Sequence, residues 1–250
     1  MKAALLALVL AGAPADNALF ALYAEGHYPD AMRRGEESHT AQGLAIAARA
    51  ALADAMMRPA PCLACLQRGE EDARRAVALD ARLSDAHVWL AASLGYQARI
   101  LGVVRTGLTD SPAQAKAELD QALALDPSNP YALAALGGWH AELVRAGGEF
   151  LAGKIYDASM EKSLALFDRA ERAAPHNVAV HYQIALALGG SDKISYHARI
   201  ESELQAAIEG PPQTVYEKFV AGRAQELLTL MKRGDSDAFD AKLKTFQGYP

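Results

Sequence analysis

The two cysteines of the chain, Cys62 and Cys65, are the residues whose spacing most clearly suggests chemistry. They stand three residues apart, directly after Pro61 and at the expected start of a helix. Cα atoms at this spacing lie about 5 Å apart in a helical turn, a distance that a disulfide bridges. We therefore expect a structural disulfide. A thiol oxidoreductase is the alternative, because a helix N-terminus lowers the pKa of a thiol, but the strand–helix–strand pattern of such enzymes is missing.

The other residues that could bind a metal or act as nucleophiles are scattered. A zinc site needs two further ligands with comparable spacing, and the sequence has no second cysteine pair. His176 and His181 are five residues apart, which places them about 140° apart around a helix. Gly-x-Ser-x-Gly, His-Glu-x-x-His and glycine-rich phosphate motifs do not occur. We expect a non-enzyme with no catalytic residue, no metal ligands and no cofactor.

Charge and composition restrict the partners and the fold class. The chain has 25 basic and 30 acidic residues, a net charge of −5, without a cluster of Lys or Arg. Nucleic acids and anionic lipid surfaces require a positive patch, so we expect neither as a partner. Apolar residues make up 51% of the chain but aromatic residues only 7%, and alanine is abundant. This composition favours closely packed helices over a sheet.

The first fifteen residues have the pattern of a secretory signal peptide. Lys2 precedes the apolar run 3–11, and Ala13-Pro14-Ala15 has the small-x-small pattern of a cleavage site. The run is shorter than the roughly 20 residues that span a bilayer. We expect residues 1–15 to be removed by cleavage after Ala15, and residues 16–250 to form one periplasmic domain without stable membrane insertion.

A recurring pattern divides the remaining chain into helical hairpins. In four places an amphipathic helix ends near a small residue, a short turn follows, and the next helix carries a large–small pair. The marker alanines are 46, 48 and 36 residues apart, and the large–small pairs have the same spacings. The four markers with their pairs are Ala76 with Leu90-Ala91, Ala122 with Leu136-Gly137, Ala170 with Ile184-Ala185 and Ala206 with Val220-Ala221. Because the alanines and the large–small pairs share the same spacings, we interpret the pattern as a sequence repeat.

The segment 122–129 (ALALDPSN), followed by Leu136-Gly137, resembles the signature of the tetratricopeptide repeat, and 26–31 (GHYPDA) resembles the turn inside such a repeat. The resemblance implies an all-α, tetratricopeptide-like helical-hairpin solenoid of roughly six antiparallel helix pairs. Two units exceed the family length of about 34 residues, which predicts longer helices and a loop near Gly147-Gly148. The helices are expected at 17–25, 29–57, 62–79, 84–104, 112–125, 129–146, 150–174, 177–189, 195–209, 213–233 and 236–247.

The same resemblance implies a function. In that family the first helix of each pair lines a concave groove that binds a protein or peptide segment. Carried over to this sequence, the groove is predicted to present Trp89, Tyr96, Tyr131, Glu142, Tyr182, Leu186 and Lys218. Only Lys218 suits the carboxylate clamp of some members, so we expect aromatic anchors instead. For each aromatic residue the alternative is a place in the core between units.

We therefore expect an exported, non-enzymatic adaptor whose oligomeric state the sequence leaves open. The alternative is an accessory component of a periplasmic solute-uptake system, which binds an apolar ligand or a transporter subunit.

Overall fold

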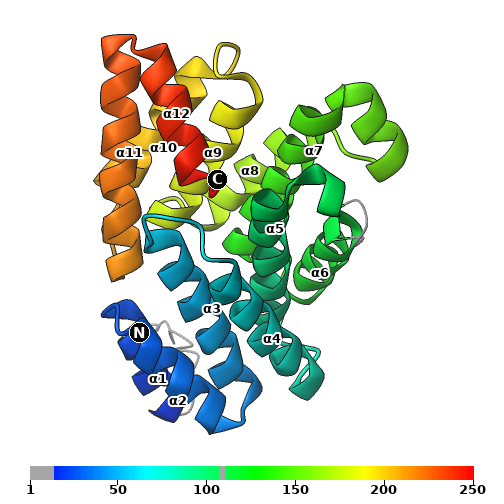
Figure 1. The fold of residues 1–250 in the computed structure, drawn as a ribbon, viewed down its shortest axis with the longest axis vertical. Helices are drawn as coiled ribbons and strands as arrows, with labels where there is room; N and C mark the ends of the chain where they lie inside the picture. Colours follow the sequence, from blue (N-terminus) through cyan, green and yellow to red (C-terminus); the bar gives the residue numbers. More distant parts are fainter. Residues whose placement is uncertain (1–13, 107–110) are drawn as a thin grey trace, which may run out of the picture.

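The computed structural model describes residues 14–106 and 111–250, and within them it contains helices and no strand (Figure 1). This confirms the all-α fold class. In chain order the helices are α1 (Pro14–Ala24), α2 (Tyr28–Ser38), α3 (Ala41–Met57), α4 (Leu63–Leu79), α5 (Ser84–Thr106), α6 (Ser111–Leu125), α7 (Pro130–Tyr156), α8 (Met160–Ala173), α9 (Val178–Asp192), α10 (His197–Glu209), α11 (Val215–Arg233) and α12 (Ser236–Phe246).

The odd-numbered helices from α3 to α11 form an inner layer. Each of them contacts the next odd helix, so that α3, α5, α7, α9 and α11 follow one another, and the even helices pack on their outer side. The row curves so strongly that α11 also contacts α3. Figure 1 shows the lower end of α11 close to the N-terminal helices. The inner layer is therefore a strongly curved row of helices whose two ends meet, and the solenoid of six helix pairs stays a prediction.

One predicted helix, 29–57, is two helices in the structure. The chain turns at His39, which has a left-handed backbone (φ 51°), and α3 begins after Thr40, whose hydroxyl accepts a hydrogen bond from the Gly43 amide. Two glycines let α2 and α3 approach closely, since a Cβ on Gly35 would lie 2.4 Å from the Gly43 carbonyl oxygen. The sequence expectation missed this break because the helical pattern continues across it.

Two inner helices are kinked at glycines in nearly the same conformation. Gly102 in α5 has φ 77° and ψ 165°, and Gly148 in α7 has φ 75° and ψ 159°. This region of backbone space is open almost only to glycine. The loop predicted at Gly147-Gly148 is therefore a kink, and α7 continues to Tyr156 before the chain turns at Asp157 (φ 55°).

The predicted small-residue positions are packed inside. Ala91 and Ala185 are buried, and a Cβ on Gly137 would lie only 2.5 Å from the ring of Phe167, which is itself fully buried. Side-chain caps start the inner helices, since the amide oxygens of Asn129 and Asn177 accept hydrogen bonds from main-chain N–H groups of α7 and α9. Close helix contact at these points confirms the packing that the repeat pattern predicted.

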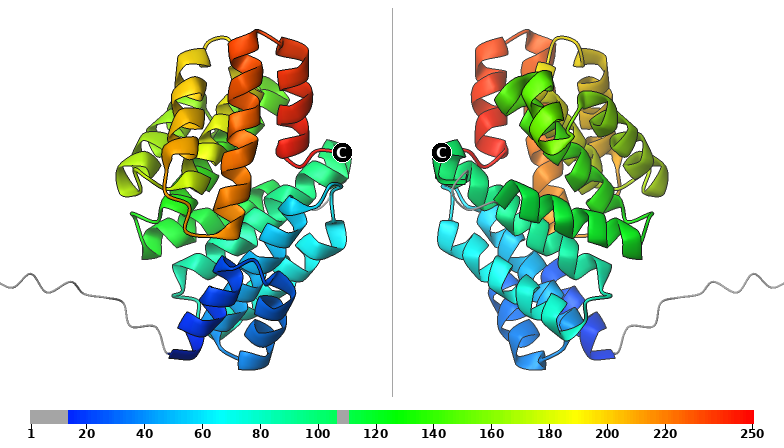
Figure 2. Two further views of the ribbon diagram at one scale, coloured as in Figure 1. Left: turned by 90° about the vertical axis from the view of Figure 1, so that its left-hand side faces the viewer. Right: turned by 90° about the vertical axis from the view of Figure 1, so that its right-hand side faces the viewer.

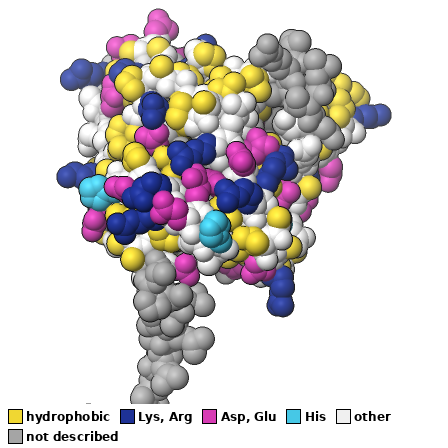
Figure 3. Space-filling view, turned by 60° about the horizontal axis from the view of Figure 1, so that its bottom comes forward, with side chains coloured by type: hydrophobic (Ala, Val, Ile, Leu, Met, Phe, Trp, Pro, Cys, Tyr) yellow, Lys and Arg dark blue, Asp and Glu magenta, His cyan; other side chains and the backbone are white. Residues whose placement is uncertain are grey.

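Two further expectations concern the ends and the surface. Of the predicted signal peptide, residues 1–13 lie outside the described residues, and α1 begins at Pro14; cleavage after Ala15 and a periplasmic location stay predictions. Among the described helices none has the length and apolar character needed to cross a membrane. On the face in Figure 3, basic and acidic side chains are interspersed, so this face carries no continuous area of one charge.

Candidate functional site

The inner helices line a cavity of about 490 Å³. Its walls come mainly from α3, α5, α7 and α9, with contributions from α1, α6, α11 and the C-terminal segment. The volume falls within the range of about 300–1,000 Å³ that is typical of small-molecule sites. Small side chains leave this space open: a Cβ added to Gly95 or Gly138 would meet no atom within 4 Å.

Arg49 of α3 supplies a positive charge at one end of the cavity. Its guanidinium donates a hydrogen bond of 3.0 Å to the hydroxyl of Tyr131. Aromatic rings surround it, with centroids 4.6 Å (Tyr23), 4.9 Å (Trp89) and 5.0 Å (Tyr131) from its central carbon. Burial opposes its charge, but Tyr23, Tyr131 and Asp85 outweigh burial and raise the pKa of Arg49 above its ordinary value. Arg49 forms no ion pair with any residue that the structure describes.

The other polar end of the cavity is built around Glu142 of α7. Glu142 accepts short hydrogen bonds from Arg145 and from the hydroxyl of Tyr249. Burial would raise the pKa of Glu142, but the nearby charge of Arg99 and these two hydrogen bonds lower it below the usual value. This end therefore contains a carboxylate among its two arginines, in contrast to the end at Arg49.

The C-terminal segment 247–249 lies against this second end of the cavity. Figure 2 shows the C-terminus beside the end of α5. The main-chain carbonyl of Gln247 accepts a hydrogen bond of 3.1 Å from Arg99, and its side-chain amide donates one of 2.8 Å to the Leu186 carbonyl. Gly248 packs on the ring of Tyr96. The turn that ends α12 is thus held at the cavity wall by both main-chain and side-chain contacts.

The structure brings most of the predicted groove residues to this cavity. The five that line it are Trp89, Tyr96, Tyr131, Glu142 and Leu186. Tyr182 instead lies in the core, with 1% of its surface exposed, and Lys218 is exposed on α11 away from the cavity wall. Tyr182 and Lys218 were carried over from repeat positions, and those positions rotate out of the cavity where the inner layer curves toward α11.

Sequence reasoning missed the two arginines that dominate the polar chemistry, Arg49 and Arg99. A signal for Arg49 was present: it is the only cationic residue in α3, a helix in which most neighbouring residues are buried. A lone cation in such a helix must find partners for its N–H groups or a polar space to face. The sequence contained no comparable signal for Arg99, because the carbonyl group that it binds belongs to Gln247, 148 positions away.

The cysteines form the predicted disulfide. Cys62 and Cys65 are bonded, with Cα atoms 5.3 Å apart. The sulfur of Cys62 also caps α4, since it accepts a hydrogen bond of 3.3 Å from the Cys65 amide. The bridge lies beside a small pocket that includes Tyr96 and Gly248, and it therefore supports the wall near the C-terminal segment.

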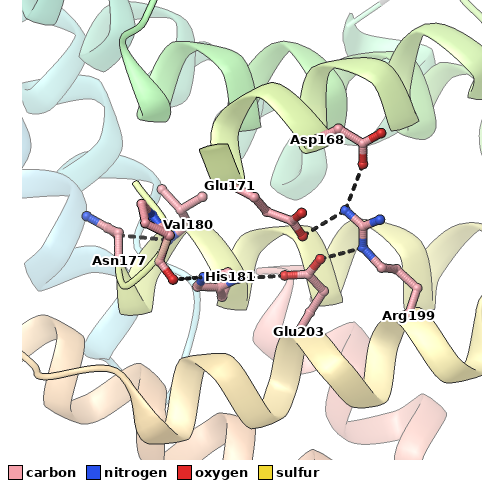
Figure 4. A network of polar contacts seen from close by, with 8 residues as sticks. Asp168, Glu171, Asn177, Val180, His181, Arg199 and Glu203 are labelled. Carbon is pink, nitrogen blue, oxygen red and sulfur yellow. Dashed lines mark hydrogen bonds and ion pairs between the residues drawn. The ribbon is translucent and has the colours of Figure 1, made fainter. Parts of the chain in front are cut away.

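Three residues near the outer side of α9, Glu171, His181 and Glu203, have the mutual distances of a metal ligand set, within 4.8 Å of one another (Figure 4). A guanidinium already fills the position between the carboxylates: Arg199 donates to Glu203 at 2.6 Å and to Glu171 at 2.7 Å. Both nitrogens of the His181 ring are engaged as well, with Glu203 at 2.7 Å and with the Pro175 carbonyl at 3.0 Å. The cluster is an ion-pair network that joins α8, α9 and α10.

An equivalent device occurs on α5. His87 has one ring nitrogen 2.5 Å from Glu118 and the other 3.0 Å from the Ala81 carbonyl, which is six residues earlier, as Pro175 is relative to His181. His87 and His181 both occupy the fourth position of their helices. In both hairpins a histidine thus ties an inner helix to the following outer helix and to the preceding turn.

The described structure defines an all-α protein whose inner helices line a cavity that is partly open to solvent. The family described as Regulator of microtubule dynamics protein 1-3 matches residues 32–232, from within α2 to the end of α11. The chain belongs to this family. No curated protein matches the chain.

The tetratricopeptide assignment made from the sequence is therefore wrong as a family assignment. The residues that suggested it were a helix end with proline and a large–small pair in the next helix. Any two antiparallel helices that pack closely across a short turn favour such residues, so the pattern reports helix pairing and does not single out one family.

Proposed function

We propose that this protein is a non-enzymatic binding protein whose cavity holds an elongated, mostly apolar small molecule. The cavity between α3, α5, α7 and α9 carries the proposal, because its volume and its largely apolar wall are those of a ligand site. At the second polar end, Glu142 is hydrogen-bonded to Arg145 and to Tyr249 of the C-terminal segment. These contacts hold the side chains in place, which suits a wall that binds a ligand.

The wall favours a hydrocarbon over a peptide chain as the deeply buried guest. Gln183 donates its amide to the Tyr96 hydroxyl at 3.1 Å, and the Tyr131 hydroxyl accepts from both Arg49 and Asn177. Few polar groups are left for the main chain of a peptide, and each buried amide without a partner costs about 1–3 kcal/mol. The proposal keeps the apolar ligand of the solute-uptake alternative but does not include a role in transport.

A second candidate function is the binding of a protein segment, and one observation favours it. The chain's own segment 247–249 is seated against Arg99 and Leu186 through main-chain and side-chain hydrogen bonds. A segment of another protein with similar residues could use the same contacts. The name of the family says that its namesake members regulate microtubule dynamics. Such a role is consistent with the binding of a protein partner.

We further propose that the helices form a repeat of six hairpins, α1/α2 to α11/α12, curved around the cavity. The equivalent histidines on α5 and α9 and the asparagine caps of α7 and α9 support this. Under this proposal the inner helix of each hairpin presents its small residues to the guest.

A cavity-filling variant tests the main proposal. Gly138→Phe places a ring into open space in the cavity, whereas Gly222→Phe on α11 places one in open space outside the cavity wall. The neutral dye Nile red should bind the wild type and Gly222→Phe at one saturable site, with binding to Gly138→Phe lost. Dye binding that is absent from the wild type, or equal in all three proteins, would contradict a ligand cavity.

A fluorescent peptide with the sequence of residues 244–250 tests the second candidate. Deleting residues 247–250 removes the contacts with Arg99, Leu186 and Glu142, which frees the seat of the C-terminal segment. The peptide should bind this shortened protein more tightly than the wild type. Equal affinity for both proteins would count against recognition of a segment at this place.

A further inference from the structure

The cationic end of the cavity lacks a counter-charge. A guanidinium has five N–H donors; Arg49 donates one to the Tyr131 hydroxyl at 3.0 Å and also interacts with the Tyr23 hydroxyl, and neither partner carries a negative charge. The rings of Tyr23, Trp89 and Tyr131 lie around the guanidinium, where they stabilise the charge without neutralising it. Arg49 is therefore a partly buried cation that faces a mostly apolar space.

The carboxylates nearest to Arg49 are committed to other partners. Asp85 accepts a hydrogen bond of 3.0 Å from the Asn129 side chain, and no described acid lies within ion-pair distance of Arg49. Glu217, on the cavity wall, accepts a hydrogen bond of 2.6 Å from the Gln213 amide at the start of α11. The second cationic end differs, because it contains a carboxylate, Glu142, next to Arg99 and Arg145.

We propose that Arg49 is the subsite for a carboxylate at the end of an apolar guest. This inference rests on the proposed ligand-binding function and adds the chemistry of the head group. One carboxylate neutralises one guanidinium, and its two oxygens match two parallel N–H donors. From Arg49 the wall continues along Ala53 and Ala92 to Gly138, and this small, apolar surface leaves room for a hydrocarbon chain.

Calorimetric titration with dodecanoate and with its methyl ester tests the proposal on the unmodified protein. The two probes have the same chain, but only the acid carries a charge. Because a hydrogen-bonded charge pair of this kind is worth a factor of about ten or more in affinity, dodecanoate should bind at least about tenfold more tightly. In Arg49→Met the two probes should bind equally, and Arg49→Lys should keep a smaller preference for the acid.

Each outcome has a distinct meaning. Equal affinity of the wild type for acid and ester overturns the carboxylate subsite and leaves the ligand cavity standing, whereas failure of both probes and of Nile red overturns the cavity as well. A preference for the acid that persists in Arg49→Met removes the assignment to Arg49. The wild-type comparison needs no variant, so it decides the question even if Arg49→Met does not fold.

A further pair of probes separates the two sources of a terminal carboxylate. Trileucine with a free C-terminus and its amide replace the fatty acid and the ester in the same titration. Tighter binding of free trileucine than of dodecanoate supports the subsite and identifies a protein C-terminus as its source. The reverse order supports the subsite with a fatty acid as its source.

Discussion

The guanidinium of Arg49 and the hydroxyl of Tyr131 are joined by a hydrogen bond of 3.0 Å, although the two residues are 82 positions apart. The same hydroxyl accepts a second hydrogen bond of 3.0 Å from Asn177, the cap of α9. One phenol oxygen thus connects α3, α7 and the start of α9. It fixes the cationic end of the cavity and links three helices of the inner layer.

Replacing Tyr131 with Phe should destabilise the protein by about 2 kcal/mol, because two donors lose their acceptor and one of them is charged. Urea denaturation of the variant and the wild type measures the difference. Tyr156→Phe is the control: its ring also packs in the wall, against Trp139, but its hydroxyl forms no hydrogen bond with a described residue. Equal stabilities of the two variants would show that the Tyr131 hydroxyl does not link the helices.

Asp72 should make the fold sensitive to pH. Its side chain is buried and one of its oxygens has no hydrogen-bond partner. Burial, and then the charge of Glu36, raise the pKa of Asp72 to about 7. The folded state therefore holds this proton more tightly than the unfolded state, and the corresponding stability, complete below about pH 4, is lost as the pH rises to about 7.

Asp72→Asn should consequently match the wild type near pH 4 and exceed its stability by about 1–2 kcal/mol near pH 8. Urea midpoints at both pH values measure this difference. Asp120→Asn, at an exposed ion pair with Lys116, should change stability by less than about 1 kcal/mol at either pH. A stability difference for Asp72→Asn that does not grow with pH would contradict the raised pKa.

The His181 ring is placed to carry a charge. Both of its nitrogens face acceptors, the Glu203 carboxylate and the Pro175 carbonyl. Burial opposes protonation, but these hydrogen bonds outweigh burial and raise the pKa of His181 above its ordinary value. The raised pKa contributes stability that is present below about pH 6.5 and is lost as the pH rises through the folded-state value.

His181→Asn should therefore cost about 3 kcal/mol near pH 6 and less near pH 9, because it breaks a buried pair. The free energy of unfolding of both proteins at the two pH values provides the measurement. His176→Asn, at an exposed position in the preceding turn, should have little effect. If His181→Asn lowered the free energy of unfolding more at pH 9 than at pH 6, the His181 ring would be neutral in the folded protein.

Gly148→Ala should destabilise the protein by about 2 kcal/mol, because alanine is strained at φ 75° and ψ 159°. Gly138→Ala in the same helix should instead stabilise it by about 0.5–1 kcal/mol, since alanine favours the helix and its Cβ meets open space. Thermal unfolding followed by circular dichroism compares them. Similar shifts of the two melting temperatures would show that the kink at Gly148 is not required.

The disulfide should contribute about 2 kcal/mol or less, because it closes a very short loop. Replacing both Cys62 and Cys65 with Ser removes the bridge but keeps a capping side chain at position 62. The double Ala variant removes the cap too and should cost about 1 kcal/mol more. Insulin reduction by the parent protein is expected to be at background level; a rate above it would favour the oxidoreductase alternative.

The sequence alone determined the helical class, the disulfide and the close packing between successive helices. These features depend on neighbours in the chain: Cys62 and Cys65 lie within one helical turn, and Gly137 faces Phe167 of the next helix. Helix-forming residues, turn residues and small contact residues express such local relationships directly. For the same reason they could not distinguish one family of helical hairpins from another.

Only the tertiary structure decided which residues face the cavity. The curvature of the inner layer brings α11 to α3, turns Tyr182 into the core and leaves Lys218 in solvent. It also places Arg49 beside Tyr131 and Arg99 beside Gln247, across 82 and 148 positions of chain. Curvature is the sum of small rotations at each helix contact, set by side-chain volumes on both partners, and a local sequence pattern does not contain that sum.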